Sequence, residues 1–180
     1  MRIKPEDTCC VIIDYQEKIL PTMAEKEKLI ANSVKLLTGL RILEIPMIMT
    51  AQYAKGLGEN VPEITDAAGI TEYCDKKTFS ICDDPCAAEK LKKLGKKNVI
   101  LCGIEAHICV QQTVSGLLEG GYVPILVEDC ISSRDLHNKE IAVMRAVQEG
   151  AVVTTCESLL FELTGAAGTE QFKQISKLIK

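Results

Sequence analysis

The 180-residue chain contains no tryptophan and only two histidines, and aromatic residues make up 4% of it. Long apolar runs are also missing, since none approaches the roughly 18 residues that a membrane-spanning helix needs. The first eight residues, MRIKPEDT, lack the apolar segment of a signal peptide. We therefore expect a cytoplasmic protein with no membrane partner.

Histidine is too scarce here for the commonest metal sites, because His107 and His137 have no neighbouring His or Cys at metal-ligand spacing. The G-x-S-x-G motif of many serine hydrolases is absent. The glycine-rich loops that hold dinucleotides or nucleotide phosphates are absent as well, and the first predicted strand is followed by Asp14-Tyr15-Gln16-Glu17. We predict neither a metal nor a cofactor.

Positive charge is also in short supply, with 21 Lys and Arg against 25 Asp and Glu and a net charge of −4. The isoelectric point near 5.3 disfavours a nucleic acid or an anionic membrane as partner, because the overall field would repel both. A small neutral or polar molecule is the kind of substrate that this composition favours.

Cysteine, in contrast, is abundant, with nine residues in the chain. The count is odd, no C-x-x-C pair occurs, and no secretory signal supplies an oxidising compartment, so we expect reduced thiols that lie mostly in the core. The vicinal pair Cys9-Cys10 allows redox sensing as an alternative, although its place inside a predicted strand favours burial. The hydrophobic content of 47% suits one well-packed domain over residues 1–180.

Hydrophobic periodicity predicts alternating strands and helices. Strands are expected at 8–13, 46–51, 98–103, 123–127 and 151–155, with a short polar edge strand within 73–79. Helices are expected at 29–40, at 85–94, from Cys109 to the glycines at 120–121, from the capping residues at 132–135 to Gly150, at 158–163 and at 172–179. Residues 52–69 show no clear periodicity, so we expect a loop there that is long enough to cover a pocket.

This alternation predicts a three-layer α/β/α sandwich with a six-stranded, mostly parallel sheet. In the common Rossmann-like order 3-2-1-4-5-6, ligands bind beyond the carboxyl ends of the strands, at the switch point between strands one and four. Strand one ends at Asp14, and strand four leads into the turn before Cys109. The fold prediction therefore places a carboxylate and a thiol at one crevice.

The stretch at 98–121, NVILCGIEAHICVQQTVSGLLEGG, has the pattern of a strand, a sharp turn and a helix. Cys109 is predicted in the first turn of that helix, where unpaired N–H groups and the helix dipole would lower the pKa of its thiol. A thiolate there is a candidate nucleophile. Taken by itself, Cys109 is equally consistent with a small buried hydrophobic residue.

Three separated motifs resemble the isochorismatase-like cysteine hydrolases. They are the strand ending VIIDYQ at 11–16, the K-x-x-F-S pattern at 76–80, and GIEAHICV at 103–110. The resemblance covers nearly the whole chain. The stretches TAQYAKGLG from Thr50, GIEAHICVQQT and SSRDLHN from Ser132 are most similar to the isochorismatase-domain-containing subgroup.

The resemblance implies a set of catalytic roles. Asp14 would be the acid/base, Cys109 the nucleophile that forms a thioester, and Lys76 a fixed cation that keeps Asp14 ionised and favours the thiolate. The backbone N–H groups of Glu105 and Cys109 would form the oxyanion hole, with a cis peptide between Ile104 and Glu105. Relatives are often oligomers, so a homo-oligomer is expected. Each residue also has an ordinary interpretation: Asp14 could cap a helix with Glu17 at D-x-x-E, and Lys76 and Lys77 could be solvated.

The pocket is expected to include Gln16, Gln52, Tyr53, Phe79 and His107. Nicotinamidases of this family bind a metal through aspartate and histidine after strand two, but residues 52–62 contain neither. True isochorismatases cleave a vinyl ether and need no cysteine nucleophile, so the cysteine favours hydrolysis of a C–N bond in a small amide or related molecule. An ether hydrolase, or a non-catalytic oligomeric binding or scaffold protein on the same fold, is the alternative.

Overall fold

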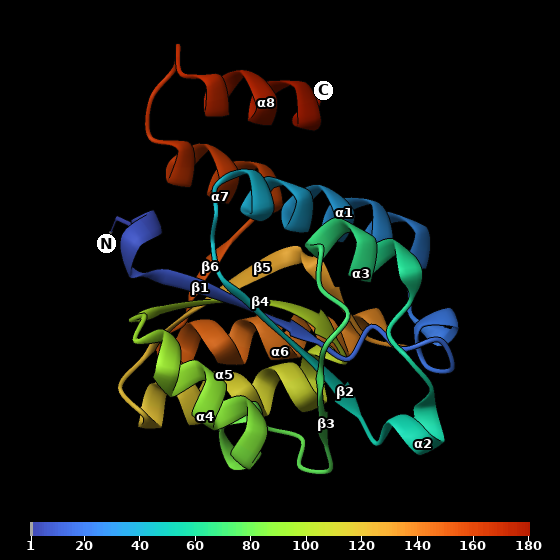
Figure 1. Ribbon diagram of the computed structural model, residues 1–180. Helices are drawn as coiled ribbons and strands as arrows, with labels where there is room; N and C mark the ends of the chain where they lie inside the picture. The colour runs from blue at the N-terminus through green and yellow to red at the C-terminus, as the bar shows by residue number, and fades with distance from the viewer. Residues whose placement is uncertain (1) are drawn as a thin grey trace.

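The computed structural model describes residues 2–180 and is built on one six-stranded parallel sheet (Figure 1). The strands lie in the order β3-β2-β1-β4-β5-β6, as predicted. Their bounds are β1 (Thr8–Ile13), β2 (Met47–Gln52), β3 (Cys74–Lys76), β4 (Asn98–Ile104), β5 (Val123–Ser132) and β6 (Val152–Thr154). All six residues of β1 and all seven of β4 are buried, which explains why these strands are apolar throughout and show no alternation.

Helices cover both faces of the sheet and complete the predicted three layers. One face packs against α1 (Lys26–Ile42), α3 (Pro62–Ala68) and α7 (Cys156–Thr164), and the other against α4 (Pro85–Leu94), α5 (Gln111–Glu119) and α6 (Leu136–Glu149), as Figure 1 shows. The last helix, α8 (Glu170–Ile179), packs on the outside of α1 and α7. Shorter turns are η1 (Pro5–Asp7), η2 (Leu20–Thr22), α2 (Ala54–Leu57), η3 (Ile81–Asp83) and η4 (Ala106–Val110). Each face of the sheet carries its own hydrophobic core.

Two predicted boundaries were wrong for local reasons. The expected loop at 52–69 contains α2 and α3, each too short to show a helical period, although α3 buries Ile64 and starts at Pro62. Strand β5 continues past the predicted end at Val127 to Ser132, because a register shift against β4 between Leu101 and Gly103 lets pairing resume beyond the irregularity.

The expectation that all nine cysteines are reduced thiols was also wrong. Cys74 in β3 and Cys86 in α4 form a disulfide, with their Cα atoms 5.8 Å apart. The pairing joins residues 12 positions apart, and only the packing of the edge strand against the start of α4 reveals it. Cys9 and Cys10 are both buried in β1 as free thiols, as their place in a strand favoured.

No helix within residues 2–180 is long and apolar enough to cross a membrane.

Candidate active site

Asp14 follows the last residue of β1 and lies at the carboxyl edge of the sheet, between β2 and β4. Its backbone has φ = 56°, a left-handed conformation that a non-glycine residue adopts at a cost and that aspartate tolerates better than most. The Thr50 hydroxyl in β2 donates a 2.8 Å hydrogen bond to Asp14 Oδ1. Asp14 is not a helix cap, because the chain continues into an irregular segment and not into a helix. This geometry holds the carboxylate at the end of the central strand.

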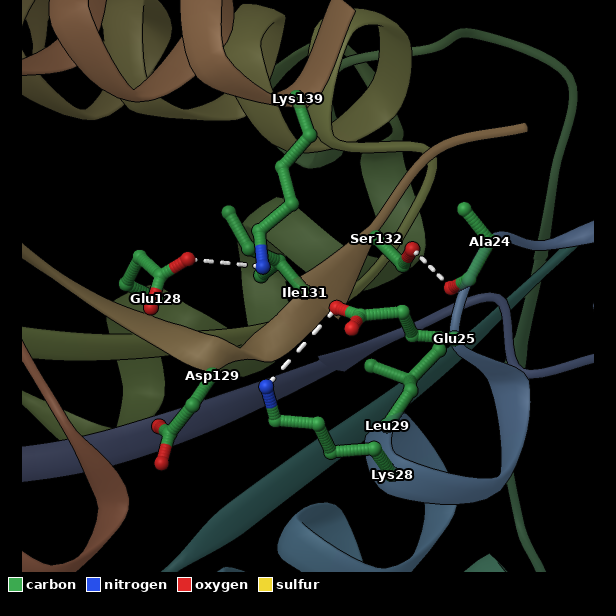
Figure 2. A pocket seen from close by; sticks show the side chains of 9 residues that line it. All are labelled: Ala24, Glu25, Lys28, Leu29, Glu128, Asp129, Ile131, Ser132 and Lys139. Carbon is green, nitrogen blue, oxygen red and sulfur yellow. Dashed lines mark hydrogen bonds and ion pairs between the residues drawn. The ribbon is translucent and has the colours of Figure 1, made fainter. Parts of the chain in front are cut away.

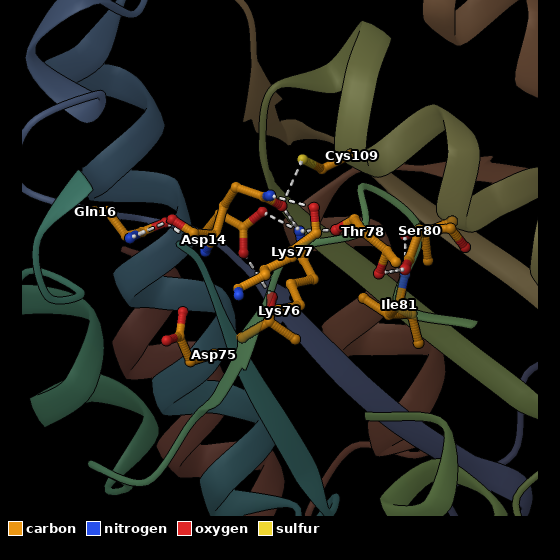
Figure 3. A network of polar contacts seen from close by, with 12 residues as sticks. Asp14, Gln16, Asp75, Lys76, Lys77, Thr78, Ser80, Ile81 and Cys109 are labelled. Carbon is orange, nitrogen blue, oxygen red and sulfur yellow. Dashed lines mark hydrogen bonds and ion pairs between the residues drawn. The ribbon is translucent and has the colours of Figure 1, made fainter. Parts of the chain in front are cut away.

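Lys76 is the last residue of β3, and its side chain is completely buried. Its Nζ lies 2.7 Å from Asp14 Oδ2 and 2.6 Å from Gln52 Oε1, and it also donates a 3.4 Å bond to the Thr78 carbonyl (Figure 3). Gln52 of the neighbouring strand β2 pairs in register with Lys76, so both side chains lie at the same edge of the sheet. Lys77 is exposed. The structure therefore brings Lys76, and not Lys77, to Asp14.

Cys109 lies in η4, a π-helical turn that precedes α5, and not in the first turn of α5 as predicted. The extra residue of a π turn shifts the side chains that precede the regular helix. The N–H groups of Ile108 and Val110 both donate to the Glu105 carbonyl, at 3.1 and 3.2 Å, and so hold the turn. The Cys109 sulfur faces the Asp14–Lys76 pair in Figure 3 and lies 3.9 Å from Gln52 Oε1.

The thiol of Cys109 titrates in the direction opposite to the one predicted. Its pKa is raised to about 12, chiefly by burial and also by the negative charge of Asp14, and the positive charge of Lys76 offsets only part of this increase. The prediction of a lowered pKa was wrong because only 6% of the residue is exposed, so desolvation of the anion outweighs the helix dipole. The resting form of Cys109 is therefore the neutral thiol.

The turn between β4 and Cys109 depends on a close approach of two strands. Gly103 has φ = 131°, and a Cβ atom at this position would lie 2.1 Å from the Ile13 carbonyl oxygen. Only glycine fits such a contact. The peptide between Ile104 and Glu105 is cis. The buried Glu105 carboxylate accepts hydrogen bonds from the backbone N–H and the Nε of Arg134, at 3.0 and 3.2 Å, and so ties this turn to the segment after β5.

A pocket of about 120 Å³ opens beside these groups. Its lining includes Asp14 and Cys109, together with Gln16, Ile19, Gln52, Leu57, Phe79, Ile104, Glu105 and Ile108. Carbon atoms form almost all of its free surface. The arrangement places the Cys109 thiol and the Asp14 carboxylate in the wall of a small apolar cavity, with the Lys76 ammonium group paired to the carboxylate.

Of the five predicted pocket residues, Gln16, Gln52 and Phe79 line this cavity, and Tyr53 and His107 lie outside its lining. Tyr53 is exposed and packs beside Gly56, and the His107 Nδ1 lies 2.9 Å from the Ser133 hydroxyl.

Sequence reasoning missed Thr50, the hydrogen-bond donor to Asp14. Its position near the end of β2, beside the end of β1, was the available signal. It also missed the aliphatic wall residues Ile19, Leu57 and Ile108, whose types occur throughout the core.

A second cavity lies between the start of α1 and the second half of β5, and Lys139 of α6 also lines it (Figure 2). Its charged groups are largely paired: Lys139 Nζ lies 2.7 Å from Glu128 Oε1, and Lys28 Nζ lies 3.9 Å from Glu25 Oε2. The Asp129 carboxylate accepts a hydrogen bond from the Cys156 N–H. The lining contains no thiol and no histidine. Reactive groups converge at the pocket of Cys109 and not here.

One group of potential metal ligands occurs within residues 2–180, formed by Cys74, Asp84 and Cys86 with donor atoms within 4.8 Å of one another. Its two sulfur atoms are bonded to each other and offer no thiolate. The Asp84 carboxylate accepts the N–H of Ala87 at the start of α4. These residues do not fit a metal site in the disulfide form.

The family model of the isochorismatase domain matches residues 8–158, which contain β1 to β6 and all the groups described above. The chain belongs to the isochorismatase family. It is 37% identical over 179 residues to isochorismatase domain-containing protein 2 of Danio rerio, covering 99% of this chain and 89% of that one. It is 34% identical to the secreted isochorismatase effector Isc1 of Phytophthora sojae, covering 99% and 87%.

Among solved structures, this chain is similar to one described as the MAR1 ribonuclease of Caenorhabditis elegans. The two share a TM-score of 0.91 and 39% identity over 99% of this chain and 92% of the other. Together with the family model, these similarities identify an isochorismatase-family hydrolase domain. Because one relative is named as secreted, the cytoplasmic location of this chain stays a prediction.

Proposed function

We propose that this protein is a cysteine hydrolase that cleaves the C–N bond of a small amide, or of a related molecule, without a metal. The observation that carries the proposal is the buried ion pair between Asp14 and Lys76, 2.7 Å long, beside the thiol of Cys109 at the edge of a cavity. Burying two charges costs desolvation free energy, and this cost can exceed the attraction between them. Its position next to a nucleophilic side chain supports a catalytic role.

In the proposed first step, Asp14 accepts the proton of the Cys109 thiol while the sulfur attacks the carbonyl carbon of the substrate. The two events are coupled because burial raises the pKa of the thiol to about 12, so a free thiolate scarcely exists beforehand. Asp14 then gives the proton to the nitrogen of the leaving amine. The C–N bond breaks and a thioester forms on Cys109.

In the second step, water attacks the thioester carbon and Asp14 accepts a proton from this water. The C–S bond breaks, the proton returns to the sulfur, and a carboxylic acid leaves. Lys76 positions Asp14 through both steps by its hydrogen bonds to Asp14 and Gln52. We assign the oxyanion to the backbone N–H groups of Glu105 and Cys109, since both belong to the turn that carries the nucleophile.

Hydrolysis of nucleic acid, which the name of the Caenorhabditis elegans protein suggests for that protein, is less suited to this site. A polyanion needs several free cations. The cavity lining contains no lysine or arginine, Lys76 is paired with Asp14, and the chain has a net charge of −4. A small substrate therefore remains the proposal.

We also propose a homo-oligomer, with α6 at the contact between copies. Leu136, Ile141, Met144 and Val147 are all exposed on this helix. In a two-fold antiparallel pairing, Ile141 of one copy would meet Met144 of the other. Glu140 would then lie near the second copy's Arg145, so the charges are complementary as well. Self-complementarity of this kind is what an isologous interface requires.

The experiment that tests the catalytic proposal measures hydrolysis of a panel of small amides by the wild type and by Cys109→Ala, with Cys82→Ala as the matched control. Cys82 is a half-buried free thiol outside the pocket lining. We expect Cys109→Ala to lose turnover and Cys82→Ala to keep it. If Cys109→Ala retains the wild-type rate, the thioester mechanism is wrong and proton transfer by Asp14 alone, as in ether hydrolysis, takes its place. If no member of the panel is turned over by the wild type, the binding or scaffold alternative is favoured.

A further inference from the structure

The polar side chains in the wall of the pocket are already engaged by other parts of the protein. Gln16 Nε2 donates to the carbonyls of Gln52 and Gly58 at 3.1 and 2.7 Å, and Gln16 Oε1 accepts from the Gln52 N–H at 2.7 Å. This amide therefore ties the segment after β1 to the end of β2 and to the segment that follows β2. Neither of its ends is left to bind a ligand without breaking a bond inside the protein.

The other polar groups in the lining are engaged in the same way. Gln52 Oε1 accepts from Lys76 Nζ, and Gln52 Nε2 donates to the Lys77 carbonyl at 2.9 Å. The Glu105 carboxylate is held by Arg134. The charges of Lys76 and Asp14 cancel each other across 2.7 Å. A second charge brought in by a substrate would find no partner here.

The remaining wall is apolar and small. It consists of Ile19, Leu57, Phe79, Ile104 and Ile108, which come from four separate segments of the chain. The pocket volume is about 120 Å³. A chain of a few carbon atoms fills such a space, whereas a buried carboxylate without a partner is strongly disfavoured there.

We propose that the site accepts amides with a short, uncharged, apolar acyl group and rejects acyl groups that carry a carboxylate. The inference rests on the proposed function, because it assumes that the acyl carbon is attacked by Cys109. The amide end then lies between Cys109 and Asp14, and the hydrocarbon end lies against Leu57, Phe79 and Ile108. The substrate class is a short aliphatic amide such as butyramide.

Alkylation of Cys109 tests the charge preference without any turnover. Iodoacetamide and iodoacetate both add to a thiolate with loss of iodide, and they differ in the neutral amide and the carboxylate that they carry into the pocket. The rate ratio of the two reagents at one pH cancels the thiolate fraction. Peptide mass spectrometry measures the ratio of the iodoacetamide rate to the iodoacetate rate at Cys109. We expect this ratio to exceed that of the neutral thiol N-acetylcysteine amide by at least about tenfold. An equal ratio would overturn the proposal.

A cation placed in the wall should reverse the preference. Leu57 is only partly buried, so Leu57→Lys can place an ammonium group at the pocket with its aliphatic stem along the wall. We expect Leu57→Lys to lower the ratio toward that of the free thiol. The neutral, similarly sized Leu57→Met is the matched control and should keep the ratio of the wild type. If both variants behave alike, the wall does not select charge.

Hydrolysis completes the test and separates the two claims. Butyramide and succinamate share a four-carbon chain and differ by a terminal carboxylate, and the neutral pentanamide controls for added length. We expect turnover of butyramide and pentanamide to exceed that of succinamate by at least about tenfold. Equal turnover of all three would refute the charge selection and leave the amidase proposal intact. A high alkylation ratio with no turnover of any amide would refute the amidase proposal and leave the charge selection intact.

Discussion

Lys76 Nζ lies 2.7 Å from Asp14 Oδ2, and both side chains are buried. These residues are 62 positions apart in the sequence. They meet because Lys76 ends β3, Asp14 follows β1, and β2 lies between them with Gln52 bridging to the lysine. The pair depends on strand order and not on any local motif.

Removal of Lys76 should be costly, because it leaves the Asp14 carboxylate buried without its partner. We expect Lys76→Met to lower the free energy of unfolding by about 3–5 kcal/mol and to abolish hydrolysis. The neighbouring Lys77→Met is the matched control, since Lys77 is exposed, and it should change the stability by less than about 0.5 kcal/mol. Urea unfolding of both variants measures the difference. Similar losses in the two variants would contradict the assignment of Lys76.

The raised pKa of Cys109 predicts an unusual pH profile of alkylation. The thiol of an ordinary cysteine has a pKa of about 8.5 and is almost fully ionised by about pH 10, whereas the pKa of Cys109 is raised to about 12, chiefly by burial. The rate with iodoacetamide should therefore keep rising by about tenfold per pH unit beyond pH 9. Asp14→Asn removes a negative charge that raises this pKa, so the profile should move to lower pH although hydrolysis is lost. A wild-type profile that levels off by about pH 10, as that of an ordinary thiol does, would show that the thiol is not desolvated in this way.

The same raised pKa carries a consequence for stability. Because the folded-state pKa of Cys109 lies above that of the unfolded chain, the folded form is favoured below about pH 9, and this contribution is lost as pH rises toward 12. The difference in unfolding free energy between the wild type and Cys109→Ser should accordingly shrink with rising pH, when both are measured by urea unfolding between pH 8 and pH 10.

Gly103 should be irreplaceable where β4 passes the end of β1. A Cβ atom would meet the Ile13 carbonyl at 2.1 Å, so Gly103→Ala must push β4 away from β1. We expect a loss of more than about 2 kcal/mol in unfolding free energy, together with reduced hydrolysis. Gly95→Ala is the control, because Gly95 also has a positive φ of +62° but has open space around its Cβ position. Its cost should stay near about 1 kcal/mol. Equal costs would mean that backbone conformation alone matters at both positions.

The proposed contact through α6 is tested by charge. Met144→Glu places a carboxylate in the middle of the exposed apolar face, beside Glu140, and should dissociate the oligomer without unfolding the chain. Light scattering after size exclusion measures the mass of each form. Lys90→Glu on α4, away from this face, is the matched control and should leave the mass unchanged. A monomeric wild type, or a Met144→Glu variant with the wild-type mass, would rule out this interface.

The alternation of strands and helices, together with the common strand order of Rossmann-like folds, was sufficient to predict the sheet order. That order in turn predicted the convergence of Asp14 with Cys109, because the strands that lead to them are neighbours. The sequence distinguished Lys76 from Lys77 only through a motif, and the structure adds the reason, which is that Lys76 is the buried last residue of β3 whereas Lys77 follows the strand and is exposed. The disulfide between Cys74 and Cys86 could not be predicted, since it depends on how an edge strand packs against α4.

The pKa of Cys109 was predicted in the wrong direction for a related reason. A helix terminus can be recognised in a sequence, but the depth of burial that outweighs its dipole cannot. The apolar wall of the pocket was missed similarly, because Ile19, Leu57 and Ile108 are of types that serve equally well in any core. These features arise from packing between segments that no single stretch of sequence describes.

Direct detection of an acyl-enzyme tests the central claim, that Cys109 forms a thioester during hydrolysis. The protein is mixed with p-nitrophenyl butyrate, quenched in acid during turnover, and digested for mass spectrometry. We predict one butyryl group, located on the peptide that contains Cys109, and its absence in Cys109→Ala together with loss of turnover. Turnover that persists in Cys109→Ala, or a butyryl group on another residue, would contradict the account.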